Sequence, residues 1–89
     1  MLIRSQNKRI LINMNNVSSI EVGDNELRIF ADDGETIYDL GEYYTKAKAM
    51  KVLDMIQDTY ERYEYEKVFK TGLTLFETFQ MPEDSEVEV

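Results

Sequence analysis

Apolar side chains recur at every second position in the first half of the chain, in residues Ile10–Met14 and Ile20–Val22. This period of two is typical of a strand with one buried face. Two further runs, Leu27–Phe30 and Thr36–Leu40, are rich in residues that favour strands. The pattern therefore predicts several short, half-buried antiparallel strands within the first forty residues.

Turn-forming residues separate these strands. Gly23-Asp24-Asn25 and Asp32-Asp33-Gly34 each follow one apolar run and precede the next. Gly, Asn and Asp supply the positive φ angles that tight hairpin connections require. We therefore expect two hairpins and a meander strand order. The pair Asn15-Asn16 indicates a bulge or bend between two strand segments.

The pattern then changes to the period of a helix. Thr45 is suited to be the N-cap, and the helix is predicted from about Lys46 to about Tyr63. Its apolar stripe, which should lie on the sheet, consists of Ala49, Met50, Leu53, Ile56 and Tyr60, flanked by Val52 and Tyr63.

The segment from Glu66 to Gln80 fits strand alternation about as well as a helical turn. We favour a closing hairpin with its turn at Thr71-Gly72, docked on the sheet or its edge and ended by Pro82. Residues 83–89 carry four acidic side chains and no basic one, which is typical of a flexible, solvated tail. Residues 1–82 are thus expected to form a single α+β domain, an antiparallel meander sheet of four to six strands with one long amphipathic helix on one face. An exposed edge or the C-terminal segment could pair two copies.

The composition excludes most enzyme classes. The chain has no Cys and no His, so thiol nucleophiles, disulfides and imidazole metal sites are all ruled out. The four glycines lie far apart and form no phosphate-binding loop, and Asp32 and Asp33 are neighbours in a turn rather than a pair facing across a cleft. We expect a non-enzymatic protein without cofactor or metal. No secretory signal opens the chain and no apolar run approaches the ~18 residues of a membrane span, so we expect a cytoplasmic, bacterial-type protein.

Charge is divided unevenly along the chain. The net charge is −8, of which residues 1–51, with 7 basic and 8 acidic side chains, contribute −1. Residues 52–89 hold 3 basic and 10 acidic side chains and contribute −7. Such an acidic half repels phosphate backbones, so general nucleic-acid binding is not expected. A protein with a basic surface is the partner that this charge favours.

The predicted helix has a charge gradient opposite to the one that its macrodipole favours. Lysines stand at its N-terminal end (Lys46, Lys48, Lys51) and acids follow (Asp54, Asp58, Glu61, Glu64). One interpretation is an anion-binding site for a phosphate or an acidic segment, made of Arg4, Lys8, Arg9, Lys46 and Lys48. The competing interpretation is a set of separate, solvated cations.

Tyrosines and acids are interleaved between Tyr60 and Glu66, which we call the tyrosine–acid stretch. Tyrosine rings supply contact area at low entropic cost, and carboxylates pair with Arg and Lys. A protein contact made by Tyr60, Glu61, Tyr63, Glu64 and Tyr65 is one hypothesis. The other is that Tyr60 and Tyr63 belong to the core and Tyr65 begins a strand.

Several segments resemble small uncharacterised proteins of low-GC Gram-positive bacteria and their phages: Met1–Gln6, Leu11–Val17, Leu40–Tyr43, Ala49–Gln57 and Phe79–Pro82. The resemblance extends over nearly the whole chain and includes no catalytic signature. It implies a small acidic protein of a mobile element, a class whose members are often modulators that bind a host protein and include inhibitors of immune nucleases. The leading hypothesis is a non-enzymatic modulator that occludes a basic surface of a host protein. The alternative is an oligomeric binder, or sponge, for a phosphate-bearing molecule or nucleotide.

Overall fold

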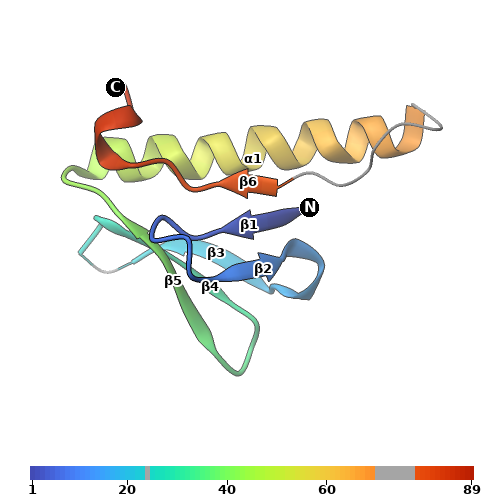
Figure 1. Ribbon diagram of the computed structural model, residues 1–89, viewed down its shortest axis with the longest axis horizontal. Helices are drawn as coiled ribbons and strands as arrows, with labels where there is room; N and C mark the ends of the chain where they lie inside the picture. Colours follow the sequence, from blue (N-terminus) through green and yellow to red (C-terminus); the bar gives the residue numbers. More distant parts are fainter. Residues whose placement is uncertain (24, 70–77) are drawn as a thin grey trace.

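The computed structural model describes residues 1–23, 25–69 and 78–89, and it contains one long helix and two small sheets (Figure 1). The elements in chain order are β1 (Leu2–Arg4), β2 (Leu11–Asn13), the 3-10 helix η1 (Met14–Asn16), β3 (Ser19–Val22), β4 (Arg28–Asp32), β5 (Ile37–Glu42), α1 (Lys46–Phe69), β6 (Thr78–Gln80) and the 3-10 helix η2 (Asp84–Glu86). The predicted α+β class is therefore confirmed. In the described part of the chain, no helix combines the length and the apolar character needed to cross a membrane.

The strands form two three-stranded sheets rather than one meander. One sheet is the antiparallel meander β3-β4-β5, in which Ile20 lies opposite Ala31 and Ala31 opposite Tyr38. The other has the order β2-β1-β6 and pairs β6 parallel to β1. The prediction of a single meander sheet of four to six strands is therefore wrong. A parallel pair needs a long crossover connection, and here α1 lies in the chain between the two partners.

The predicted turns agree with the structure only in part. Gly34 has a positive φ of 97°, as expected for the β4–β5 connection, and the Asp33 carboxylate accepts from the backbone N–H of Glu35 and Thr36. In the β3–β4 connection Glu26, with φ 61°, has the positive angle that we expected from Gly23 or Asn25, and Asp24 lies outside the described residues. Residues 15–16, where we expected a bulge or bend between two strand segments, belong to η1, which lies between β2 and β3 and whose N-cap Asn13 accepts from the N–H of residue 15.

The helix begins as predicted and continues further. The Thr45 hydroxyl accepts from the N–H of Lys48 at 3.1 Å. The helix ends at Phe69, so the closing hairpin that we favoured is wrong in its first strand, and its predicted turn, residues 71–72, lies outside the described residues. Helix-favouring residues continue past Tyr63 with no Gly or Pro to stop the helix there. The later strand does join a sheet, as β6, and Pro82 follows its end.

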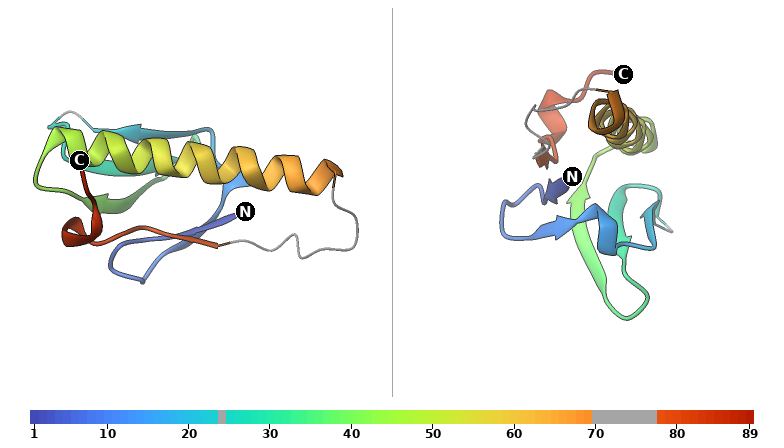
Figure 2. Two further views of the ribbon diagram at one scale, coloured as in Figure 1. Left: turned by 90° about the horizontal axis from the view of Figure 1, so that it is seen from above. Right: turned by 90° about the vertical axis from the view of Figure 1, so that its right-hand side faces the viewer.

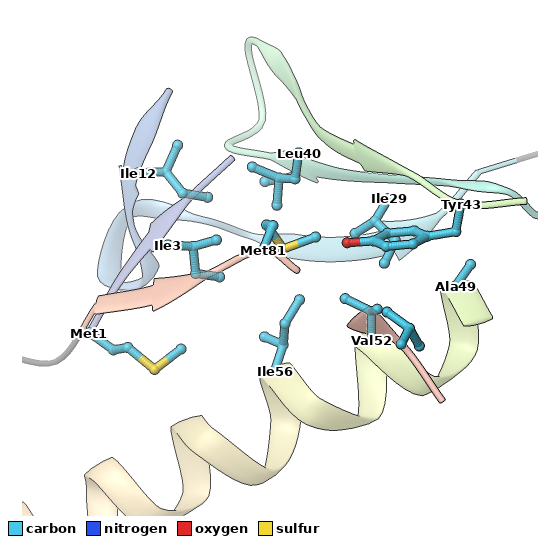
Figure 3. Close-up of a cluster of buried hydrophobic side chains, with 12 residues drawn as sticks. Met1, Ile3, Ile12, Ile29, Leu40, Tyr43, Ala49, Val52, Ile56 and Met81 are labelled. Carbon is cyan, nitrogen blue, oxygen red and sulfur yellow. The ribbon is translucent and has the colours of Figure 1, made fainter. Parts of the chain in front are cut away.

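The core lies between α1 and the two sheets, as Figure 3 shows. It contains Ile3 and Ile12 from one sheet, Ile29, Ala31 and Leu40 from the other, Ala49, Val52 and Ile56 from the helix, and Met1, Tyr43, Met81 and Val87. The helical stripe is therefore rotated from the predicted one. Met50 is 40% exposed, and Leu53 is only partly buried.

Most of the segment that we expected to be a solvated tail belongs to the fold. Figure 2 shows η2 folded beside the first turns of α1. Val87 is 5% exposed, and the Tyr43 hydroxyl donates to the Pro82 carbonyl at 2.8 Å. Burial raises the pKa of this hydroxyl, which keeps it protonated as a donor. The prediction of a solvated tail counted the acidic residues and overlooked Val87, whose burial stabilises the packing of this segment against the rest of the protein.

Candidate protein-contact surface

One face of α1 is exposed along the described length of the helix. Its members recur at spacings of three and four, which places them on one side, and we call them the outer face: Met50, Lys51, Asp54, Gln57, Asp58, Glu61, Arg62 and Tyr65. The buried Val52 and Ile56 lie on the opposite side of the helix. Three of the outer-face residues are acids and two, Lys51 and Arg62, are basic, so the face carries a net charge of −1.

The five residues proposed for partner contact divide between two sides of the helix. Glu61 and Tyr65 are exposed, with Tyr65 at 59%, whereas Tyr60 and Tyr63 are partly buried and pack against the core. Glu64 lies between these groups and accepts a hydrogen bond from the Tyr60 hydroxyl, whose pKa it raises. Tyr60 and Tyr63 therefore pack against the core, as the second hypothesis expected, although Tyr65 is helical and begins no strand; protein contact stays a prediction.

Sequence reasoning left two residues out of the candidate surface. Asp54 and Asp58 stand one turn apart and continue the line of Glu61 and Tyr65 on the outer face. Both were noted in the charge gradient but were not combined with the tyrosine–acid stretch. The spacing of Asp54, Asp58 and Glu61 within the predicted helix is the signal that would have joined them.

An apolar groove lies beside the outer face, where α1 meets β3 and η1. It has a volume of about 260 Å³, and its lining, which we call the helix groove, consists of Met14, Ile20, Leu53, Ile56, Gln57 and Tyr60. The Gln57 side-chain amide donates to the Glu61 carboxylate at 3.1 Å. Glu61 and Glu64 thus each bind a side chain of the lining. The groove is apolar inside and acidic along its helical rim.

The five residues proposed for anion binding lie on two different elements, the start of α1 and the β1–β2 hairpin. Lys46 forms an ion pair with Glu26 of the β3–β4 connection, with Nζ and Oε1 3.0 Å apart. Lys48 pairs with Asp84 at 2.9 Å, while Arg4, Lys8 and Arg9 are exposed on the β1–β2 hairpin. Lys46 and Lys48 therefore each have a carboxylate partner already, which reduces their attraction for a phosphate. Phosphate capture by these five residues stays a prediction.

The Asp84 carboxylate connects the C-terminal segment to the start of the helix. Its Oδ1 accepts from the Tyr44 N–H at 2.8 Å, and its Oδ2 accepts from Lys48 Nζ. The hydrogen bond from Tyr44, and then the Lys48 ammonium, lower the pKa of Asp84. A negative charge here is also favoured by the positive end of the helix dipole.

No family model matches this chain, and no curated protein or solved structure is significantly similar to it. Among the described residues, no group of three or more acidic side chains is arranged to hold a metal ion. The fold and surface define an acidic α+β domain with one exposed charged helix face. Its function must be argued from that surface.

Proposed function

We propose that this chain is a non-enzymatic protein-binding module that occludes a basic surface of its partner. The observation that carries the proposal is the continuity of α1 through the tyrosine–acid stretch. One rigid element presents Asp54, Asp58, Glu61 and Tyr65 along a single exposed face. The resemblance to proteins of mobile elements suggests a host defence protein as the partner.

The physical basis is complementarity of charge supported by aromatic contact. Carboxylates held by a helix keep their spacing, so little conformational freedom is lost when Arg or Lys side chains bind them. The exposed Tyr65 ring supplies apolar area at the end of the acidic line. Attraction between such surfaces is screened over about 8–10 Å at moderate salt, so binding should weaken as ionic strength rises.

The experiment measures binding of short peptides, graded from acidic to basic, to the immobilised full chain. We expect binding to increase with the positive charge of the peptide and to fall with added salt. The double variant Glu61→Lys/Glu64→Lys should lose at least about tenfold in affinity for the basic peptides. The matched control Glu35→Lys/Glu88→Lys makes the same change in net charge at exposed positions outside α1 and should bind almost normally.

Two results would contradict the proposal. Basic peptides that bind no better than acidic ones would remove the role of charge. An equal loss of affinity in both double variants would show that net charge alone, and not the face of α1, determines binding.

A further inference from the structure

The β1–β2 hairpin differs in charge from the acidic rim of the helix groove. Residues 1–20 contain Arg4, Lys8 and Arg9 and neither Asp nor Glu, although the chain as a whole has a net charge of −8. These three cations are exposed and form no ion pair with any residue that the structure describes. The hairpin itself therefore carries three positive charges and no negative one.

An exposed leucine lies on the same hairpin. Leu11 is 58% exposed and lies directly opposite Arg4 in the β1–β2 register, so both side chains project from the same face of the sheet. Lys8 and Arg9 lie in the connection that precedes Leu11, and Arg4 Nε donates to the Lys8 carbonyl at 3.1 Å. We call Arg4, Lys8, Arg9 and Leu11 the basic hairpin face. It combines one exposed apolar side chain, opposite Arg4, with two further exposed cations of the same hairpin.

The helix groove has the complementary arrangement. Its lining is almost wholly apolar, and Leu53, Tyr60, Met14 and Ile20 remain partly exposed there. The carboxylates of Glu61 and Glu64 bind the lining side chains Gln57 and Tyr60 at its rim. An apolar side chain with adjacent Arg and Lys residues matches this groove in both hydrophobicity and charge.

Both surfaces also lie at strand edges. β2 is an outer strand of the sheet β2-β1-β6, and β3, which contributes Ile20 to the groove, is an outer strand of the sheet β3-β4-β5. An outer strand has N–H and C=O groups on one side that can pair with another chain. Main-chain hydrogen bonds could therefore add to the contact between hairpin and groove.

We propose that the helix groove of one copy receives the basic hairpin face of a second copy, with Leu11 in the groove and Lys8 and Arg9 against Glu61 and Glu64. The inference does not depend on the proposed function. The two are linked because they use the same carboxylates, so self-association and binding of a basic partner compete. In the self-associated protein Glu61 and Glu64 would be covered. They would become accessible to a basic partner only when dilution, or the partner itself, separates the copies.

The experiment is sedimentation velocity of the full chain over a range of concentrations at low and high salt. We expect the weight-average mass to rise with concentration and salt to oppose this rise. Lys8→Glu/Arg9→Glu and Glu61→Lys/Glu64→Lys should each weaken self-association by at least about tenfold. An equimolar mixture of these two double variants should associate again, because every hairpin–groove contact between unlike variants then pairs opposite charges.

A matched pair of variants tests the apolar part of the contact. Leu11→Ser should weaken self-association, whereas Ile37→Ser, at an apolar side chain that is 64% exposed on β5, should not. Circular dichroism melts of all variants show whether each remains folded. The inference is overturned by a wild-type chain that stays monomeric, by a mixture that fails to associate, or by equal effects of the two serine variants.

The two proposals fail in different ways. Basic peptides that bind a strictly monomeric chain would leave the proposed function intact and overturn the hairpin–groove contact. Self-association with the expected variant pattern, but without peptide binding, would retain the contact and overturn the proposed function.

Discussion

The two halves of α1 differ in what they contact. Lys46–Ile56 contains Ala49, Val52 and Ile56, all of them buried. In the following residues, 57–66, even the tyrosines that face the core are only partly buried. Burial of apolar side chains thus holds the first half of the helix against the sheets. The second half remains helical although its side chains are much less buried. One continuous element therefore contributes to the core at one end and presents a contact surface at the other.

Charge differs between the same two halves, and the structure explains why the lysines are tolerated at the N-terminal end. Glu26 and Asp84 come from segments distant in sequence and pair with Lys46 and Lys48. The positive helix end therefore lies near carboxylates that other segments bring to it. In the second half Glu61 accepts from Gln57 and Glu64 accepts from Tyr60, both within the helix itself, and we propose these two acids as partner-binding residues.

Ile56→Ala should have the largest effect, because it removes buried methyl groups from the half of the helix that packs on the sheets. Ile56 is 3% exposed, and a truncation of this kind costs about 2–5 kcal/mol of unfolding free energy. Leu53→Ala, one turn away but partly exposed at the groove, should cost about 1–2 kcal/mol. Urea denaturation of both variants measures the difference. Equal losses would mean that Leu53 is as much a core residue as Ile56.

Asp84→Asn should have a smaller effect that depends on pH. The pKa of Asp84 is lowered in the folded state by the Tyr44 N–H and by Lys48. A group with a lowered pKa stabilises the fold above its unfolded pKa, ~3.9, and this contribution is lost as pH falls through the folded value. The wild type should therefore melt at a higher temperature than Asp84→Asn at neutral pH, and the gap should close in acid.

The matched control for this measurement is Asp58→Asn, on the outer face of α1. Because Asp58 is exposed, the melting temperature of this variant should differ from that of the wild type by only a small amount. A gap for Asp84→Asn that persists at the lowest pH would mean that the Asp84 charge does not secure the C-terminal segment to the helix.

The local parts of the fold could be predicted from the sequence, and the long-range pairings could not. Alternation and turn residues identified the strands that became β3, β4 and β5, and Thr45 marked the start of α1. The pairing of β6 with β1 joins segments more than seventy residues apart, as the register of Ile3 with Phe79 shows. Three-residue strands carry too little pattern to identify such a partner, because many short apolar segments would fit.

The candidate surface was predicted in composition but not in arrangement. The tyrosine–acid stretch was identified, and the predicted stripe already turned Tyr60 and Tyr63 toward the sheet, but the exposed position of Tyr65 on the helix depends on the helix continuing past Tyr63. The groove depends on Met14 and Ile20, which reach α1 only through tertiary packing. Spacing within one helix can be read from a sequence, whereas the contribution of another element to its surface cannot.

Glu61→Ala should have the smallest effect on stability. It therefore tests most directly whether the second half of α1 serves binding rather than stability. The change removes an exposed hydrogen bond with Gln57 one turn away, a kind of pair worth about 0.2–0.5 kcal/mol. Urea denaturation should therefore place this variant close to the wild type and to the control Glu35→Ala, while the affinity for basic peptides falls for Glu61→Ala alone. A loss of stability approaching that of Ile56→Ala would contradict the division, because it would assign a structural role to the outer face of α1.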